Sequence, residues 1–254
     1  MSCSYLTISG YKFLALSALD ELRQKLLSEC TSLSLLGTIL LSHEGININL
    51  MGSENDLVSF KLFLKRDTQF TSINFRESYT EISPFKKLKI KIKKEIITFK
   101  NNQVCPTQGL APYIHPCELK NWLDMEKDFL LLDTRNQYEV EIGTFQKAVH
   151  INNLLHFSQL TAHLDHLDKT KPVVTFCTGG IRCEKAALHL QDAGFTEVYQ
   201  LEGGILNYFT EVGGEHYQGD CFVFDNRTAV NPKLEAVNNA QNLLAEDHPT
   251  PKLS

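Results

Sequence analysis

The sequence predicts two domains of different fold classes: an α+β N-terminal domain of ferredoxin-like pattern, and an α/β C-terminal domain with a parallel sheet. The chain has 254 residues, 43% hydrophobic and 22% charged, which is enough for two modest cores. Residues 1–104 carry 14 Lys+Arg against 10 Asp+Glu, whereas residues 105–254 carry 11 against 20. Between these halves, residues 103–116 hold three prolines and no periodic pattern. We therefore expect domains at 1–102 and 117–225, a linker at 103–116 and a C-terminal tail at 226–254.

Short apolar runs that alternate with two helical patterns predict the N-terminal domain. Ser53, followed by Glu54 and Asp56, is a typical start for the second helix. The predicted order is strand Tyr5–Ser9, helix Ala18–Glu29, strands Leu35–Leu41 and Ile46–Met51, helix Glu54–Lys65 and strand Ile73–Tyr79. This β-α-β-β-α-β order is the ferredoxin-like one.

In the C-terminal domain, strands alternate with helices. The strands are continuously apolar, as in parallel sheets that are covered on both faces. Gly194 is placed to end the third helix. The predicted strands are Phe129–Leu132, Val173–Phe176 and Val198–Leu201, and the predicted helices are Cys117–Met125, Gln137–Ile142, Cys183–Ala193 and Ile205–Phe209.

The segment with the clearest chemical signal joins the strand ending at Phe176 to the helix beginning near Cys183. Its sequence is Cys177-Thr178-Gly179-Gly180-Ile181-Arg182. Loop N–H groups, a helix N-terminus and the Arg182 charge would converge on the Cys177 sulfur and lower its pKa. The two glycines let the backbone curl around an anion. We therefore predict Cys177 as the reactive residue rather than a buried small hydrophobe.

Three residues around this loop have more than one interpretation. Cys183 is either a resolving thiol for Cys177 or a small residue at a helix start, and the structural interpretation is favoured. Asp133 and Arg135 stand at the carboxyl end of a predicted parallel strand, where binding groups collect. An internal ion pair that braces the loop is favoured over direct catalysis for them.

A second signal is a strand-like segment, residues 85–94, in which lysine alternates with leucine or isoleucine. We expect one face to bury Leu88, Ile90 and Ile92 and the other to present a line of lysines about 20 Å long. That line suits a polyanion such as RNA, and an edge strand protected from aggregation is an equal alternative. The candidate RNA-binding residues are Lys86, Lys87, Lys89, Lys91, Lys93 and Lys94.

Other candidates are weaker. We interpret three aromatic residues as core rather than as base-stacking groups, namely Phe75, Tyr79 and Phe85. His163 and His166 are interpreted as a solvated pair, and His43 with Glu44 precedes a turn and could reach substrate. The seven cysteines include no C-x-x-C pair, and no iron-binding or dinucleotide motif is present, so no metal or cofactor is evident.

The loop spacing resembles that of a known superfamily. Cysteine-dependent phosphatases use C-x5-R, whereas Cys177 and Arg182 form the C-x4-R of rhodanese-like sulfurtransferases, which carry a persulfide on this cysteine. Asp133-Thr134-Arg135 resembles the rhodanese D-x-R element, and Gly203-Gly204 its later glycine pair. The C-terminal domain is therefore expected to be rhodanese-like over about residues 113–212.

The whole chain resembles the rhodanese-type tRNA wobble-uridine hydroxylases. The resemblance runs from about Tyr5 to Val230. It rests on five segments: Gly37–Asn47, Pro84–Ile96, Asp133–Phe145, Cys177–Ala186 and Cys221–Asp225. Longer members of the family carry a cysteine-rich C-terminal extension, which this sequence, ending at Ser254, does not include.

The resemblance implies oxygen-dependent conversion of the wobble uridine, tRNA position 34, to 5-hydroxyuridine, with Cys177 as the active-site thiolate or persulfide carrier. Molecular oxygen is then a co-substrate, the electron donor is unknown, and tRNA and a sulfur- or electron-donor protein are the expected partners. We expect no DNA or membrane partner and a cytoplasmic location, since no apolar run is long enough to span a bilayer and the sequence has no leader-like start. The alternatives are a sulfurtransferase that moves sulfane sulfur through a Cys177 persulfide, and a non-enzymatic binding module.

Overall fold

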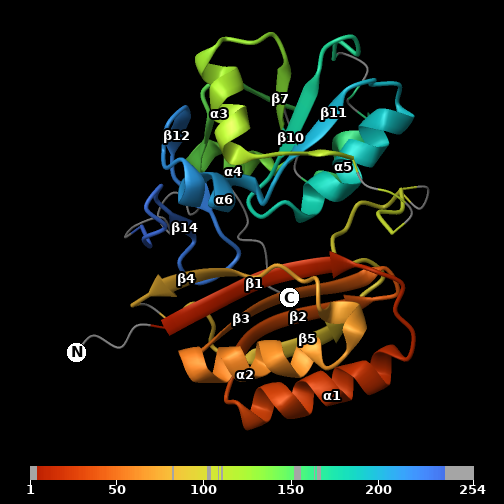
Figure 1. Cartoon of the computed structure of the whole chain (residues 1–254), viewed down its shortest axis with the longest axis vertical. Coiled ribbons are helices and arrows are strands. Elements are labelled where there is room, and N and C mark those ends of the chain that lie inside the picture. Colours follow the sequence, from red (N-terminus) through yellow and green to blue (C-terminus); the bar gives the residue numbers. More distant parts are fainter. Residues whose placement is uncertain are drawn as a thin grey trace. The chain divides into compact units, whose positions relative to one another are not determined.

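The computed structural model describes residues 5–81, 83–101, 104–107, 109, 111–151, 156–162, 164 and 167–237. The chain divides into two compact units, Met1–Thr98 and Phe99–Ser254 (Figure 1). The first unit contains an antiparallel-rich sheet with two helices, and the second a parallel sheet with helices. The predicted α+β and α/β classes are confirmed.

The first unit is a five-stranded sheet with strand order β4-β1-β3-β2-β5. Its first four strands and two helices have the ferredoxin-like topology, and β5 is added beside β2 in parallel orientation. The elements are β1 (Tyr5–Phe13), α1 (Leu19–Ser32), β2 (Leu36–Ser42), β3 (Gly45–Gly52), α2 (Glu54–Lys65), a 3-10 turn (Thr68–Phe70), β4 (Arg76–Thr80) and β5 (Leu88–Ile92). The side chain of Ser53 caps α2 by accepting from the N–H of Asp56, as this start pattern predicts.

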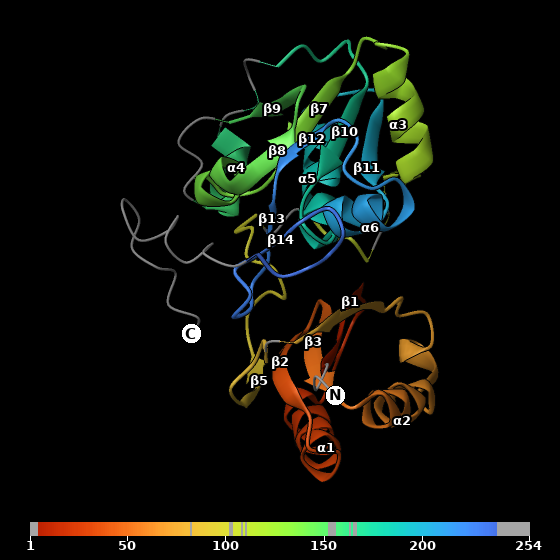
Figure 2. The same cartoon turned by 90° about the vertical axis from the view of Figure 1, so that its left-hand side faces the viewer.

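Helices α1 and α2 cover one face of this sheet (Figures 1 and 2). Alternate residues of β3, Ile46 and Ile48, pack into one core with Leu26 of α1 and Phe60 of α2. The intervening Asn47 points to the opposite face, because successive side chains of a strand alternate.

The lysine-rich strand is shorter than predicted. Within residues 85–94 only Leu88–Ile92 form β5. Ile90 is buried and Leu88 is partly buried, but Ile92 is 37% exposed, so the prediction of three buried residues is wrong for Ile92. Ile92 is the last residue of a strand at the edge of the sheet, where fewer neighbours can cover it.

The second unit is built on a parallel five-stranded sheet with strand order β6-β11-β10-β7-β9. Two short antiparallel ladders, β12-β8 and β13-β14, accompany it. The strands are β6 (Tyr113–Ile114), β7 (Leu130–Asp133), β8 (Gly143–Phe145), β9 (Ala148–His150), β10 (Val173–Phe176), β11 (Val198–Leu201), β12 (Tyr217–Gly219), β13 (Cys221–Phe222) and β14 (Ala229–Val230). The helices are α3 (Pro116–Asp124), α4 (Gln137–Ile142), a 3-10 helix (Phe157–Ala162), α5 (Ile181–Asp192) and α6 (Gly204–Glu211).

Helices lie on both faces of the parallel sheet. Phe176 of β10 packs in one core with Leu119 of α3 and Tyr208 of α6. The neighbouring Thr175, which points to the opposite face, is hydrogen-bonded to Cys183 of α5. Strand β10 is buried along its whole length, so its carboxyl end delivers Cys177 from a rigid, central position.

Parts of the predicted linker and tail belong to the second unit. Within residues 103–116, Tyr113 and Ile114 form β6, and the N–H of Gln200 donates to Pro112 O at 3.0 Å. The proline-rich composition hid this strand, because two residues are too few to show a period. Within residues 226–254, Ala229 and Val230 pair with β13. Residues 238–254 lie outside the described part of the chain.

Candidate active site

The loop that carries Cys177, residues 177–180, is called the reactive loop and lies between β10 and α5, as its sequence predicts. Cys177 directly follows β10 and is fully buried, and its Sγ accepts a hydrogen bond of 3.1 Å from the N–H of Gly180. Gly180 is the N-cap residue of α5, with φ 94°, a left-handed conformation that favours glycine. Ile181 begins the helix. The loop backbone therefore curls so that its N–H groups and the helix N-terminus face the sulfur.

Helix α6 holds the outer side of this loop. The N–H groups of Ile205 and Leu206 donate to the carbonyl oxygens of Cys177 and Thr178 at 2.9 and 3.1 Å. Between them and β11, Gly204 has φ +66°, and a Cβ there would lie 2.3 Å from Cys177 O. The loop carbonyls are thus bound by α6, which leaves the loop N–H groups for the sulfur.

Cys183 lies beside Cys177 in the first turn of α5. Both side chains are fully buried. Burial alone would raise the pKa of Cys177, but a hydrogen bond from Cys183, the Arg182 charge and the N–H groups of Arg182 and Gly179 outweigh it and lower the pKa to about 5. Burial and the adjacent Cys177 sulfur raise the pKa of Cys183 well above its ordinary value. Cys183 is thus a protonated thiol that stabilises the Cys177 thiolate.

Arg182 is not free to grip a bound anion. Its Nη1 and Nη2 donate to the two carboxylate oxygens of Glu139 at 2.6 and 2.7 Å, and the two side chains are 4% and 0% exposed. Glu139 also accepts from the N–H of Asn136, which fixes it at the start of α4. Glu139 was not among the residues predicted from the sequence. The Asn136-x-x-Glu139 spacing of a capping box is the signal that could have found it.

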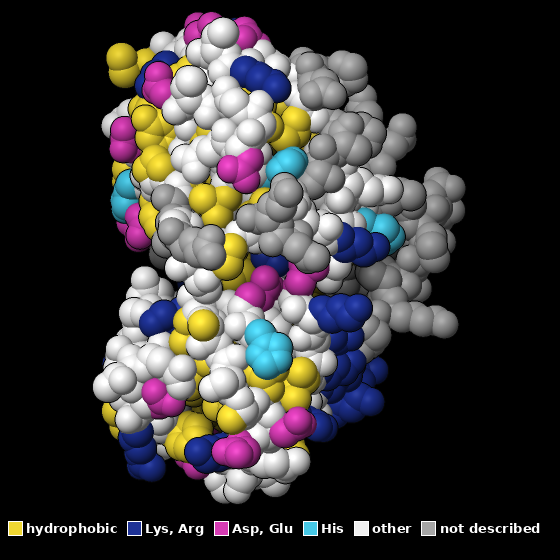
Figure 3. Space-filling model, turned by 90° about the vertical axis from the view of Figure 1, so that its right-hand side faces the viewer, with side chains coloured by type: hydrophobic (Ala, Val, Ile, Leu, Met, Phe, Trp, Pro, Cys, Tyr) yellow, Lys and Arg dark blue, Asp and Glu magenta, His cyan; other side chains and the backbone are white. Residues whose placement is uncertain are grey.

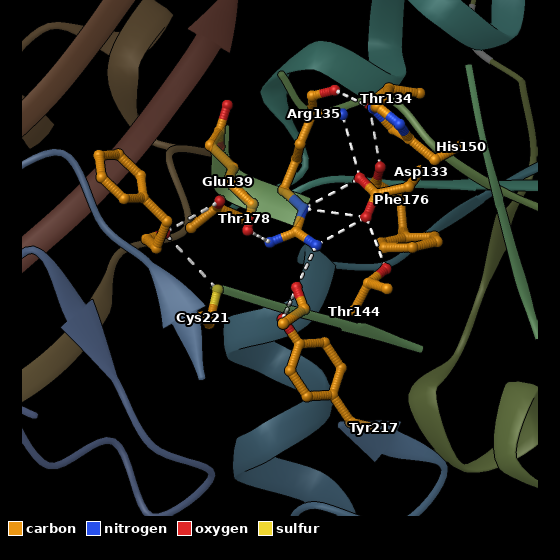
Figure 4. Close-up of polar contacts among 12 residues, drawn as sticks. Asp133, Thr134, Arg135, Glu139, Thr144, His150, Phe176, Thr178, Tyr217 and Cys221 are labelled. Carbon is orange, nitrogen blue, oxygen red and sulfur yellow. Dashed lines mark hydrogen bonds and ion pairs between the residues drawn. The ribbon is translucent and has the colours of Figure 1, made fainter. Parts of the chain in front are cut away.

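Asp133 and Arg135 form a second buried ion pair, at the end of β7 (Figure 4). Arg135 Nε and Nη2 donate to the Asp133 carboxylate at 2.9 and 2.6 Å, and Nη2 also donates to Gly143 O at 2.7 Å. Thr144 Oγ1 donates to the same carboxylate at 2.7 Å. These contacts tie β7 to the start of β8. Both residues are fully enclosed by protein and act as a brace.

The hairpin of β13 and β14 joins the loop on another side. Thr178 Oγ1 donates to Phe222 O at 3.2 Å (Figure 4). Its neighbour Cys221 is fully buried, and burial raises the pKa of this thiol to about 12. The two cysteines near Cys177 therefore stay protonated, and Cys177 is the thiol whose pKa is lowered.

The candidate RNA-binding lysines lie on and around β5 of the first unit. Lys89 and Lys91 are within the strand and half-buried, and four exposed lysines flank it: Lys86, Lys87, Lys93 and Lys94. Partial burial and the neighbouring charges of Lys89, Lys93 and Lys87 lower the pKa of Lys91. Lys and Arg side chains gather on one side of the first unit (Figure 3). The strand is also an edge strand, so both interpretations of the lysines remain compatible with its position.

The weaker candidates have mixed outcomes. Phe75 packs against the first core, but Tyr79 is 57% exposed, so its interpretation as a core residue is wrong, because it lies on the edge strand β4. Phe85 is half-buried. His43 Nδ1 is 2.9 Å from Leu16 O, and Glu44 accepts from the N–H of Ile96, so both have structural partners.

The remaining sequence candidates concern metals and membranes. His163 and His166 lie outside the described residues. Within the described ranges, no three His, Cys, Asp or Glu side chains are grouped to hold a metal ion. Across the same ranges, no helix combines the length and apolar character that crossing a membrane requires.

Comparison with known proteins agrees with this architecture. The family model "UPF0176 acylphosphatase like domain" matches residues 5–96, and "Rhodanese-like domain" matches residues 115–211. A solved rhodanese-like domain from Anabaena is 22% identical and covers 43% of this chain and 80% of its own, with TM-score 0.37. The two family models thus divide the chain into an N-terminal acylphosphatase-like part and a C-terminal rhodanese-like part.

Two relatives match nearly the whole chain. A tRNA uridine(34) hydroxylase of Cupriavidus pinatubonensis is 49% identical over 90% of this chain and 83% of the relative. One of Cupriavidus metallidurans is 48% identical over 92% of this chain and 86% of the relative. The chain belongs to the tRNA uridine(34) hydroxylase family, which confirms the resemblance identified from the sequence.

Proposed function

We propose that the protein hydroxylates the wobble uridine, position 34, of tRNA to 5-hydroxyuridine, with Cys177 as the reacting thiolate. The observation that carries the proposal is the buried Cys177 sulfur, which accepts the Gly180 N–H at the start of α5, in a chain that matches tRNA uridine(34) hydroxylases over both domains. A tRNA substrate would place the reaction in the cytoplasm. The lysines of β5 would bind the RNA backbone, and no DNA partner is needed.

A thiolate can activate uracil at the carbon that is hydroxylated. Its sulfur adds to C6, and the electron pair of the C5–C6 double bond moves to C5, where the C4 carbonyl stabilises it as an enolate. The C5 carbanion then attacks O₂ to form a C5 hydroperoxide, and a two-electron reductant with protons cleaves its O–O bond to leave a C5 hydroxyl and water. Loss of the C5 proton and expulsion of the thiolate restore the double bond. The low pKa of Cys177 favours both the attack and the expulsion, since the thiolate is also the leaving group.

The overall reaction consumes more than uridine and oxygen. Uridine, O₂, two electrons and two protons yield 5-hydroxyuridine and water. Molecular oxygen is therefore a co-substrate, and a two-electron reductant, supplied by a donor protein or a small molecule, completes the balance. The target base has to leave the anticodon stack to reach a buried sulfur, as in other enzymes that act on a nucleobase.

The same cradle suits the sulfurtransferase alternative. The terminal sulfur of a Cys177 persulfide is anionic and would accept the same N–H groups. Sulfur transfer would then deliver sulfane sulfur from thiosulfate or a donor protein to an acceptor. The two functions differ in their products, so one measurement separates them.

The test is mass spectrometry of tRNA nucleosides from a strain that lacks this gene, complemented with wild-type protein, Cys177→Ser or Cys117→Ser. Cys117 is exposed on α3 and serves as the matched control. We expect wild type and Cys117→Ser to restore 5-hydroxyuridine and Cys177→Ser to leave it at the deletion level. If the deletion strain kept 5-hydroxyuridine and the purified protein transferred sulfur from thiosulfate to cyanide, the proposed hydroxylation would be wrong and sulfur transfer would be the function.

A further inference from the structure

We infer that Phe224, at the tip of the β13–β14 hairpin, is the stacking platform for the target nucleobase. This inference rests on the proposed function. The reaction steps proposed for Cys177 give the segment Cys221–Asp225 no role. Three large hydrophobic side chains of the second unit are exposed among its described residues: Tyr113, Met125 and Phe224. Of these, Phe224 contacts Arg182, which lies in the first turn of α5 directly after the loop.

The ring of Phe224 lies against the arginine that borders the thiolate. The Arg182 guanidinium carbon is 5.6 Å from the centre of the Phe224 ring, within the range of a cation–π contact. Arg182 is held by two hydrogen bonds to Glu139 and contributes its charge to the low pKa of Cys177. The exposed ring and the reactive sulfur therefore share Arg182 as a neighbour.

The hairpin holds this ring in a fixed place. The Phe222 ring packs edge-on against Phe224 at 5.0 Å and against Tyr138 of α4 at 5.3 Å. The Thr178 hydroxyl joins the loop to Phe222 O. Beyond Phe224, the Asp225 carboxylate accepts from Arg227 Nε and Nη2 at 2.9 and 2.6 Å, which fastens the turn. A ring fixed in this way loses little conformational entropy when a base stacks on it.

The exposure and chemistry of the ring point to a nucleobase. Phe224 is 49% exposed although Phe222 and Arg182 contact it, so protein neighbours leave about half of it uncovered. A base removed from the anticodon stack loses its own stacking partners, and an aromatic side chain beside the reacting group replaces them. Base–aromatic stacking changes affinity by about 5-fold to 150-fold per base.

The test is a double-mutant cycle between the protein and the RNA. Binding is measured for the full chain with an anticodon stem-loop that carries uridine or an abasic site at position 34. The variants are wild type, Phe224→Ala, Phe224→Trp and, as a control, Met125→Ala, which removes another exposed apolar side chain of the same unit. Thermal unfolding of each variant verifies that it is folded.

We expect wild type and Met125→Ala to bind the uridine RNA about 5-fold or more tightly than the abasic RNA. Phe224→Ala should bind both RNAs with the weaker affinity, and Phe224→Trp should keep the preference. An equal loss on both RNAs, or a preference for uridine that survives in Phe224→Ala, would overturn the inference.

Complementation separates this inference from the proposed function. If wild type restores 5-hydroxyuridine and Phe224→Ala restores it equally at limiting expression, the platform is wrong and the function stands. If wild type does not restore the nucleoside, the proposed function itself fails.

Discussion

Replacing Glu139 by Gln tests how the buried ion pair controls the reactive thiolate. In the native protein the Glu139 carboxylate accepts both hydrogen bonds of the Arg182 guanidinium, and neither side chain is more than 4% exposed. Glutamine is of similar size and retains one acceptor oxygen. It leaves the buried Arg182 charge without its counter-charge, and removing one partner of such a pair costs about 3–5 kcal/mol of unfolding free energy.

A simple loss of structure would raise the pKa of Cys177 toward its ordinary value, whereas this substitution should lower the pKa further. Arg182 lowers this pKa through its positive charge, and Glu139 offsets part of that charge. Without the carboxylate, the field of Arg182 at the sulfur strengthens. We therefore expect Glu139→Gln to lower the pKa of Cys177 below about 5 while it destabilises the second unit.

Two measurements examine these expectations. Trp122, the single tryptophan, packs against Phe129 and Tyr199 in the second unit, so its fluorescence reports unfolding of that unit in denaturant. The pKa of Cys177 is measured from thiolate absorbance, with Cys177→Ser as the blank. The control is Glu141→Gln on the exposed side of α4, which should cost less than about 0.5 kcal/mol. An unchanged stability, or a Cys177 pKa that rises in a folded Glu139→Gln protein, would refute the reasoning.

Four further predictions concern the loop and β5. Gly204→Ala places a Cβ against Cys177 O and should abolish 5-hydroxyuridine formation. The control Gly194→Ala, at φ +94° but with no atom within 4 Å of the added Cβ, should keep it. Equal activity of the two variants in complemented cells would contradict the close approach at Gly204. The pKa of Cys177, about 5 against an ordinary 9.0, is lower in the folded state, so the thiolate's stabilisation is complete above pH 9 and disappears as the pH falls to 5. Denaturation should accordingly show the difference in unfolding free energy between wild type and Cys177→Ser widening from pH 5 to pH 9, and a difference constant with pH would count against the thiolate. Cys183→Ala should raise the pKa of Cys177, measured from thiolate absorbance, because it removes a hydrogen-bond donor. Lys89→Glu combined with Lys91→Glu should weaken anticodon stem-loop binding. The slope of log K against log salt concentration should become shallower by about 0.7 for each phosphate that these side chains neutralise. Lys25→Glu on α1 should change neither, and an unchanged slope in the double variant would favour the role of edge protection.

Elements with strong periodicity could be predicted from the sequence, and their bounds agree with the structure. Helices Glu54–Lys65 and Gln137–Ile142 and strands Val173–Phe176 and Val198–Leu201 have the predicted limits. The ladders β12-β8 and β13-β14 have two or three residues per strand, too few for a period to show. The hairpin that carries Phe224 is therefore visible only in the structure, although its sequence resembles that of the family.

The loop around Cys177 could also be predicted, because its residues are consecutive and a strand, glycines and a helix follow one another. The pairing of Arg182 with Glu139 could not, since 43 residues separate them and only the packing of α4 beside the loop brings them together. Strand β6 could not be predicted either, because its two residues, Tyr113 and Ile114, are too few to show a period and are recognised as a strand only by their pairing with β11.

For the stability of the Cys177 thiolate, the placement of hydrogen-bond donors matters more than the number of charged groups nearby. Asp133 and Glu139 neutralise Arg135 and Arg182 pairwise, so the four buried side chains have no net charge. The thiolate is therefore an excess negative charge, and the hydrogen bonds from Gly180 N–H and Cys183, with the nearness of Arg182, stabilise it. A persulfide is also a monoanion and would gain from the same groups. The cradle by itself suits either sulfur species, and it is a base stacked beside it on Phe224 that would commit this site to RNA.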